Sequence, residues 1–155
     1  MQQIESLRLK NFRAFQNVHL KNIPRFCVLV GANGTGKSTL FSVFAFLRDA
    51  MTTNVTAALG RLGGSRGLAE VRSRGSSGPI EIEIKLRATL ADGRSRLITY
   101  ELHVDELEGR PAVTREVLQY RRGSRGQPWR FLDFSMGKGE AVTNELDTVE
   151  DERQL

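Results

Sequence analysis

The sequence predicts an α/β fold in which a strand–loop–helix unit is followed by an antiparallel β-meander subdomain. Two observations lead to this prediction. An apolar run at residues 25–30 precedes a glycine-rich loop, and the segment after the loop has apolar side chains at helical spacing. Further along, residues 80–90 alternate between apolar and polar side chains, which is the period of a half-buried strand. A chain of 155 residues with 39% hydrophobic content is long enough to bury a real core in one lobe.

The glycine-rich loop is the most informative part of the chain. Residues 31–38 have the sequence Gly-Ala-Asn-Gly-Thr-Gly-Lys-Ser, which fits the phosphate-binding pattern G-x-x-x-x-G-K-[ST], the Walker A motif, at every fixed position. Glycine lets the backbone curl closely around phosphates, and successive amides then form an anion nest at a helix N-terminus. We therefore expect a P-loop NTPase lobe. The predicted nucleotide-binding residues of the loop are Gly31, Asn33, Gly34, Thr35, Gly36, Lys37, Ser38 and Thr39.

Three side chains of the loop have separate expected roles. Lys37 should reach the β- and γ-phosphates as a point charge, and the Ser38 hydroxyl should coordinate Mg²⁺. Thr39 is placed to contact the α-phosphate. The alternative is a glycine-rich turn with a solvated lysine, but that interpretation leaves the Lys-Ser pair after the third glycine unexplained.

Composition excludes several other classes of protein. Cys27 is the single cysteine, so a disulfide scaffold is excluded and a cysteine metal cluster is disfavoured. His19 and His103 are too few and too far apart in sequence to indicate a metal site. No apolar stretch has the length of a membrane span, and the N-terminus lacks the layout of a signal peptide. We therefore expect a cytoplasmic protein with no membrane partner.

The net charge of +5 is unevenly distributed. Arginines gather at residues 60–78 and 110–130, whereas the last residues of the chain are acidic. Basic loops of this kind bind nucleic acid or simply solvate a surface. The solvated surface is the preferred interpretation, because no aromatic side chains alternate with the arginines and no nucleic-acid fold signature is present. DNA remains a candidate partner.

Periodicity and turn residues divide the chain into four segments. Residues 1–59 should contain strands at 4–12, 17–21 and 25–30, then the loop and a helix with one apolar face. Residues 60–78 are rich in Gly, Ser and Arg, and they are the best candidate for a mobile insertion or lid. Residues 79–134 should form the antiparallel β-subdomain, and 135–155 an acidic tail without regular structure. The apolar face of the helix is expected to consist of Leu40, Val43, Phe44, Leu47 and Met51.

The N-terminal segment adds a resemblance to the loop. Residues 4–15, Ile-Glu-Ser-Leu-Arg-Leu-Lys-Asn-Phe-Arg-Ala-Phe, followed by a loop of the form Gly-x-Asn-Gly-x-Gly-Lys-Ser, resemble the start of the RecF/SMC-like branch of ABC-type ATPases. Related bacterial "AAA family" predicted ATPases include overcoming-lysogenization-like proteins, and some are linked to phage defence or DNA repair. The resemblance implies ATP and Mg²⁺ as cofactors, Arg13 near the phosphates, and Asn33 at a loop position typical of the branch. It also implies a Mg²⁺-sensing glutamine, for which Gln119 is the candidate.

Hydrolysis in this family requires motifs that the chain does not show. A Walker B strand has four apolar residues before Asp-Glu, and neither residues 104–106 nor residues 132–133 fit that description. Residues 62–65 resemble a signature motif only faintly. No catalytic residue is therefore identified, and the chain resembles an N-terminal lobe that needs a second lobe or a second protomer, as in a homodimer, for hydrolysis. The alternative hypothesis is a basic nucleic-acid-binding module with a secondary nucleotide site.

Overall fold

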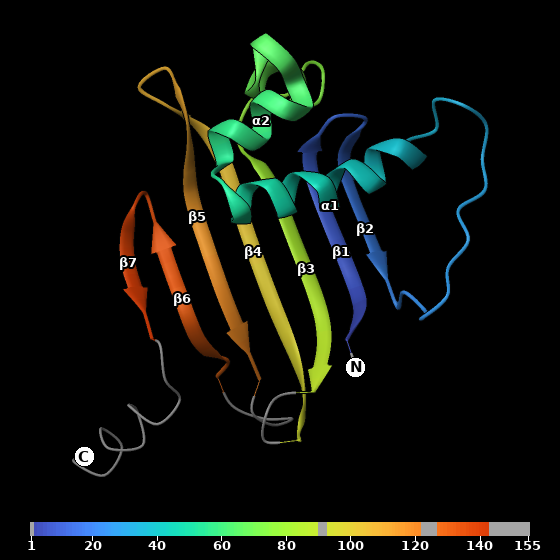
Figure 1. Cartoon of the computed structure of the whole chain (residues 1–155), viewed down its shortest axis with the longest axis vertical. Helices are drawn as coiled ribbons and strands as arrows, with labels where there is room; N and C mark the ends of the chain where they lie inside the picture. The colour runs from blue at the N-terminus through green and yellow to red at the C-terminus, as the bar shows by residue number, and fades with distance from the viewer. Residues whose placement is uncertain (1, 90–92, 122–126, 143–155) are drawn as a thin grey trace.

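The computed structural model describes residues 2–89, 93–121 and 127–142 and has two layers. A seven-stranded antiparallel sheet forms one layer, and helices lie across one of its faces (Figure 1). The elements are, in chain order, β1 (Gln3–Phe12), β2 (Phe15–Lys21), α1 (Lys37–Thr52), α2 (Val55–Gly63), the 3₁₀ turn η1 (Gly64–Arg66), α3 (Leu68–Val71), β3 (Ile80–Thr89), β4 (Ser95–Leu107), β5 (Arg110–Tyr120), β6 (Trp129–Ser135) and β7 (Lys138–Ala141).

The strand order is β2-β1-β3-β4-β5-β6-β7. The predicted meander is present as β3 to β6, which are joined by consecutive antiparallel pairings. It is not a sheet of its own, because β1 pairs directly with β3 and places Leu7 opposite Ile84. The strands expected at 4–12 and 17–21 are confirmed as β1 and β2. The fold is therefore α/β with one continuous antiparallel sheet.

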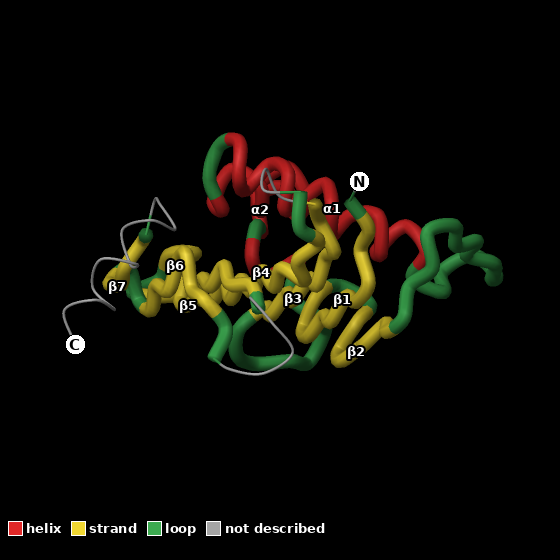
Figure 2. The backbone as a smooth tube through the Cα atoms, turned by 90° about the horizontal axis from the view of Figure 1, so that it is seen from below, coloured by secondary structure: helices red, strands yellow, loops and turns green. Residues whose placement is uncertain are grey.

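The core lies between the helices and strands β1, β3 and β4. Alternate side chains on these strands point toward the helices, and Leu9, Ile82 and Val104 are fully buried there. Phe46 of α1 packs against Phe12 of β1 with ring centroids 6.1 Å apart. Seen from below, the helices lie over β1 to β4 and α2 reaches β5, whereas no described helix lies over β6 and β7 (Figure 2).

Helix α1 confirms most of the predicted apolar face. Val43 and Leu47 are buried, and Leu40 and Phe44 pack partly against the core. Met51 is 64% exposed, so its assignment to the buried face was wrong. It lies in the last turn of the helix, at the rim of a cavity and outside the core cluster.

The segment 60–78 is more ordered than its composition predicts. It contains the end of α2, the 3₁₀ turn and α3, and two of its apolar side chains, Leu68 and Val71, are buried in the core. The amide of Ser73 also donates to the Asn11 carbonyl at 3.1 Å. The interpretation as a mobile insertion or lid is therefore wrong for residues 60–71, because these buried side chains fasten the segment to the core.

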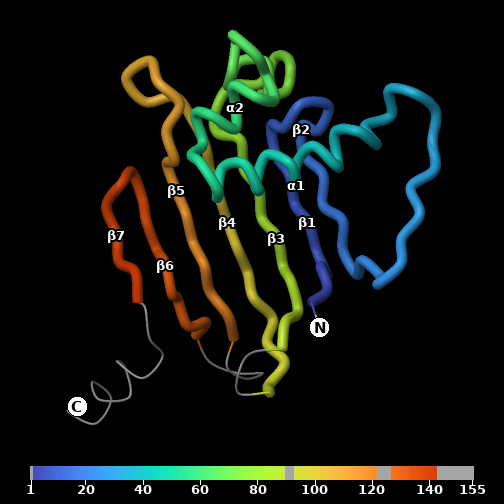
Figure 3. The backbone as a smooth tube through the Cα atoms, in the orientation of Figure 1, coloured from blue at the N-terminus to red at the C-terminus, as the bar shows by residue number. Residues whose placement is uncertain are grey.

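The strand expected at residues 25–30 is absent. This segment is irregular and belongs to a long excursion beyond β2 that returns at α1 (Figure 3). Phe26 is 82% exposed and Val30 is 90% exposed, and Cys27 is exposed as well. The predicted strand–P-loop–helix unit therefore has its loop and helix but not its strand. A buried strand needs neighbours on both sides, and no described strand pairs with this segment.

The C-terminal part was expected to lack regular structure from residue 135. Strand β7 contradicts this expectation, because it pairs with β6 and places Lys138 opposite Ser135. All four residues of β7 are exposed, so no apolar pattern signals the strand. The acidic residues at 143–155 lie outside the described residues.

Candidate functional site

The loop at residues 31–36 leads into an uncapped helix N-terminus. Gly34 and Gly36 have φ angles of 84° and 94°, which side chains with a Cβ rarely adopt. Helix α1 begins at Lys37, has no side-chain cap and has no acidic residue in its first turn. Its first backbone hydrogen bond joins the Leu40 amide to the Gly36 carbonyl at 2.9 Å. The amides of residues 37–39 therefore have no intrahelical acceptor, and they concentrate partial positive charge at the loop.

The Lys37 side chain folds back over the loop. Its ammonium donates to the carbonyl oxygens of Gly31 at 2.5 Å and Ala32 at 2.6 Å, and lies 3.5 Å from the Thr35 hydroxyl oxygen. The Thr35 hydroxyl donates to the Ala32 carbonyl at 2.9 Å and closes the same ring. A full positive charge is thus held beside the helix N-terminus, where an anionic ligand gains from both.

The turn between β1 and β2 packs against the start of α1. A Cβ atom added to Gly36 would lie 2.8 Å from Cε1 of Phe15, so the phenyl ring packs directly on the glycine. Phe15 is the last residue of the Asn-Phe-Arg-Ala-Phe segment that carries the family resemblance. Sequence analysis did not assign this packing role. Only the presence of both motifs, the Asn-Phe-Arg-Ala-Phe segment and the glycine loop, in one chain could have indicated this contact.

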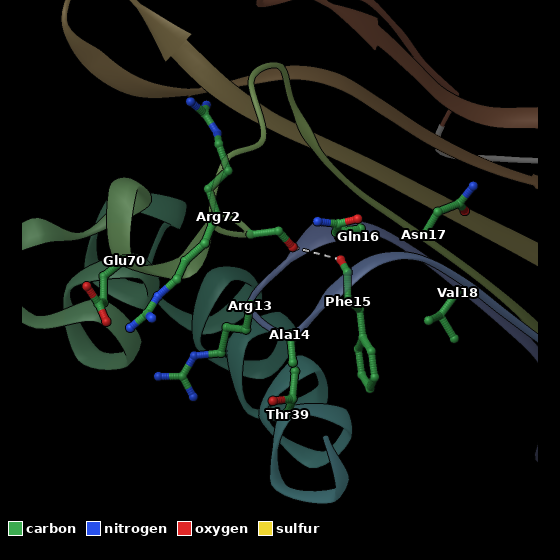
Figure 4. A pocket seen from close by; sticks show the side chains of 11 residues that line it. Arg13, Ala14, Phe15, Gln16, Asn17, Val18, Thr39, Glu70 and Arg72 are labelled. Carbon is green, nitrogen blue, oxygen red and sulfur yellow. Dashed lines mark hydrogen bonds between the residues drawn. The ribbon is translucent and has the colours of Figure 1, made fainter. Parts of the chain in front are cut away.

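Arg13 and Thr39 line one cavity of about 710 Å³ beside the loop helix (Figure 4). Arg13 has a φ of 50°, and its amide donates to the Val71 carbonyl at 2.7 Å. Its guanidinium donates to the Leu62 carbonyl at 3.1 Å. Arg13 and Thr39 thus share the lining of one cavity, but the Arg13 guanidinium is engaged with the end of α2, and its expected place near the phosphates stays a prediction. Sequence reasoning missed Arg72 and Ser73, which line the same cavity.

The remaining predicted residues fall in two places. Asn33 and Ser38 are exposed, and the Ser38 hydroxyl has no hydrogen-bond partner among the described residues. Gln119 lies on β5 opposite Thr99 and Arg130, and the cavity that it lines contains no residue of the loop 31–38. The structure thus does not bring Gln119 together with Ser38, and its role as a magnesium sensor stays a prediction.

Asp105, the first residue of the rejected Walker B pair, has a structural partner. Asp105 lies on the antiparallel strand β4, where Oδ1 accepts from Arg72 at 2.5 Å. Within the described ranges, no three His, Cys, Asp or Glu side chains gather as a metal-binding group. None of the helices in these ranges is both long enough and apolar enough to pass through a membrane.

Many of the arginines that make the chain basic are engaged with carboxylates. Arg115 bridges Glu101 and Asp133, at 3.7 and 3.3 Å, on the helix-free face of the sheet. Such pairs lower the net positive potential of a surface. The other described pairs are Arg48–Asp49, Arg61–Asp49, Arg66–Glu70, Arg72–Asp105, Arg87–Glu5 and Arg130–Asp133.

A glycine loop at an uncapped helix N-terminus, with a lysine folded across it, is an arrangement typical of the phosphate-binding-loop class. Comparison with known families agrees. Residues 26–140, well over half of the chain, match the family model described as "AAA domain, putative AbiEii toxin, Type IV TA system". The chain therefore belongs to this AAA-domain family.

A curated relative supports the N-terminal resemblance. The chain is 35% identical over 92 residues to the DNA replication and repair protein RecF of Paenarthrobacter aurescens (strain TC1). The match covers 57% of this chain and 23% of that protein. The chain thus spans about a quarter of the relative's length. Together with the family match, this confirms the predicted resemblance to RecF/SMC-like ATPases.

Proposed function

We propose that this chain is the ATP-binding N-terminal lobe of a RecF/SMC-like ATPase and that it holds Mg·ATP in the loop 31–38. One observation carries the proposal. The Lys37 ammonium and the unpaired amides at the start of α1 converge on the same exposed loop. Hydrogen bonds from an ammonium or a helix N-terminus to phosphate are charge-assisted and are worth about 1.5–3 kcal/mol each. The Ser38 hydroxyl is exposed beside this loop, which suits a magnesium ligand.

Hydrolysis would require a second lobe or a partner. The proposed site contains positive groups and hydroxyls, but the loop 31–38 has no carboxylate. The neighbouring cavity that Thr39 lines has Glu70 alone, and Arg66 already pairs with that side chain at 3.8 Å. A base or water-positioning carboxylate would therefore come from elsewhere. The exposed apolar side chains of residues 25–30 support this proposal, because a strand from a second lobe would cover them.

The first experiment titrates labelled ATP with Mg²⁺ into the wild-type chain, Lys37→Ala and Lys21→Ala. Lys21 is an exposed lysine on β2 outside the loop, so it controls for loss of one positive charge. We expect Lys37→Ala to weaken ATP binding about ten- to a hundredfold, because a charge-assisted contact is removed. Lys21→Ala should bind as the wild type does. Equal affinity in all three proteins would contradict the site assignment.

The alternative function is nucleic-acid binding through the arginine-rich segments. The named activity of the RecF relative gives DNA as the candidate ligand. Arg74 is exposed and has no ion pair among the described residues, which favours this alternative locally. It predicts DNA affinity that falls steeply with salt and survives Lys37→Ala. Salt-independent or undetectable DNA binding would exclude it.

A further inference from the structure

The helix layer covers only part of the sheet. Helices α1 and α2 lie over β1 to β4 and reach the part of β5 that contains Pro111 and Val113, whereas the rest of that face of β5 and the same face of β6 have no described helix above them (Figures 1 and 2). An apolar sheet face is normally buried against a second layer. The side chains on this open part of the face therefore indicate what could cover it.

Strand register identifies those side chains. Tyr100 packs against the core on the helix side of β4, and it pairs with Leu118 of β5. Leu118 in turn pairs with Leu132 of β6. Directly paired residues of antiparallel strands share one face, so an apolar row of three side chains crosses the sheet. Leu118 and Leu132 are half-buried, and Phe134 extends the apolar surface one pair further along β6.

A cavity lies between this row and helices α1 and α2. It has a volume of about 380 Å³ and lies where the end of α1 and the start of α2 meet β4 and β5. Met51 and Val55 form its helical side, and Tyr100 and Val113 form its floor. Met51 is 64% exposed, so the rim of the cavity adds apolar surface to the row.

One carboxylate lies among these apolar side chains. Glu116 lines the cavity, and its Oε1 accepts a hydrogen bond from the Tyr100 hydroxyl at 2.8 Å. Burial raises the pKa of Tyr100, and the hydrogen bond to Glu116 raises it further, so the phenol keeps the proton that it donates. No arginine or lysine of the described residues forms an ion pair with Glu116. The site thus combines an apolar surface with an acceptor for one cation.

We propose that the open face of β5 and β6, next to this cavity, docks an amphipathic α-helix that places a lysine or arginine against Glu116. A helix is the expected occupant because it would continue the layer that α1 begins on the same face. Its apolar stripe would cover Leu118, Leu132 and Met51. Charge complementarity requires the lysine or arginine, because covering the Glu116 carboxylate without a cation would make docking strongly unfavourable. This docking surface is independent of the proposed nucleotide site.

The test uses two fluorescein-labelled helical peptides of about 18 residues, which corresponds to roughly 27 Å of helix. Both have the same leucine-rich face, and they differ at one central position, which is lysine in one peptide and glutamine in the other. Fluorescence anisotropy measures their binding to the wild type, Glu116→Gln, Leu132→Ser and Phe41→Ser. Phe41 is 65% exposed on α1 and controls for removal of an apolar side chain elsewhere.

We expect the wild type and Phe41→Ser to bind the lysine peptide roughly tenfold more tightly than the glutamine peptide. Glu116→Gln should abolish this preference, and Leu132→Ser should weaken both peptides roughly tenfold. Circular dichroism and urea unfolding establish that each variant is folded. The proposal is overturned if the wild type binds neither peptide, if the preference survives Glu116→Gln, or if Leu132→Ser binds normally. It is also overturned if sedimentation shows a dimer that Leu132→Ser dissociates, because the occupant is then a second copy.

Discussion

At the scale of single residues, the conformation of the loop depends on Lys37 and Gly36. The Lys37 ammonium is held by the Gly31 and Ala32 carbonyls, and Gly36 combines a positive φ with direct contact to Phe15. In the proposed function, a bound phosphate would compete with those carbonyls for the ammonium. The conformation at Gly36 therefore depends on the absence of a side chain at that position.

Gly36→Ala tests this interpretation. The added Cβ meets the Phe15 ring at 2.8 Å, and alanine is strained at a φ of 94°. We expect a loss of about 1–3 kcal/mol in the free energy of unfolding, and weaker ATP binding because the start of α1 shifts. Urea denaturation measures the first effect, and titration with Mg·ATP measures the second.

Gly60→Ala is the matched control. Gly60 lies inside α2, and a Cβ added there has no atom within 4 Å. Alanine in a helix interior is favoured over glycine by about 0.5–1 kcal/mol, so this variant should be as stable as the wild type or more stable. If the two substitutions changed stability equally, contact with Phe15 would not be the cause.

At the scale of elements, Asp49 fastens the end of α1 to α2. Its carboxylate lies 2.9 Å from Arg48 and 3.4 Å from Arg61 of α2. The next helix starts a few residues later, where the Asn54 side chain accepts from the Ala57 amide at 2.8 Å. An N-cap of this kind sets where α2 begins. The joint between the two helices is thus held by polar contacts at the edge of the core.

The ion pairs of Asp49 predict a pH dependence of stability. The hydrogen bond from Arg48 is the main cause that lowers the pKa of Asp49 below its ordinary value of 3.8, and Arg61 acts in the same direction. A carboxylate with a depressed folded-state pKa stabilises the fold above its unfolded-state pKa. That stabilisation is lost as the pH falls below 3.8 and through the folded-state value. Asp49→Asn should therefore be less stable than the wild type at neutral pH, and the difference should shrink in acid.

The measurement is urea unfolding at several pH values between neutrality and strong acid. Glu106→Gln serves as the control, because Glu106 is exposed and has no ion pair among the described residues. This variant should follow the wild-type curve throughout. An unchanged gap between Asp49→Asn and the wild type in acid would show that the ion pairs do not stabilise the joint.

At the scale of the whole molecule, the sequence correctly predicted the elements that are specified by residues close together in the chain. Residues 80–90 alternate strictly in the sequence, and β3 pairs with β4 over residues 80–89, as expected. The start of α1 at Lys37 followed from the loop motif, since glycine and the Lys-Ser pair specify a turn into a helix. Both features are determined by residues that are close in sequence.

The features that were missed depend on distant or absent neighbours. The apolar run 25–30 has the composition of a buried strand, but burial requires flanking strands that no described residue supplies. Strand β7 pairs through its backbone, so its polar side chains give no signal. Likewise, the contact of Phe15 with Gly36 joins two motifs across the fold and has no local pattern.

The exposed apolar run 25–30 also leads us to predict that the isolated chain self-associates. Exposed apolar patches drive self-association, and Phe26, Val28 and Val30 are 82%, 64% and 90% exposed. Replacing these three residues with serine should therefore reduce association, as measured by light scattering at high protein concentration. The free energy of unfolding should change little for each substitution, by about 0.5 kcal/mol or less, because almost no buried surface is lost.

A buried valine gives the comparison that decides whether the exposed run contributes to folding of the lobe. Val104 is fully buried on β4, so Val104→Ser should lower the free energy of unfolding by about 2–5 kcal/mol through a cavity and a buried hydroxyl. If Val30→Ser destabilised the chain as much as Val104→Ser, residues 25–30 would be packed within the isolated lobe. Their exposure would then no longer support a second lobe as the partner that covers them. If Val30→Ser is neutral and suppresses association, the run acts as an uncovered contact surface, as the proposed function requires.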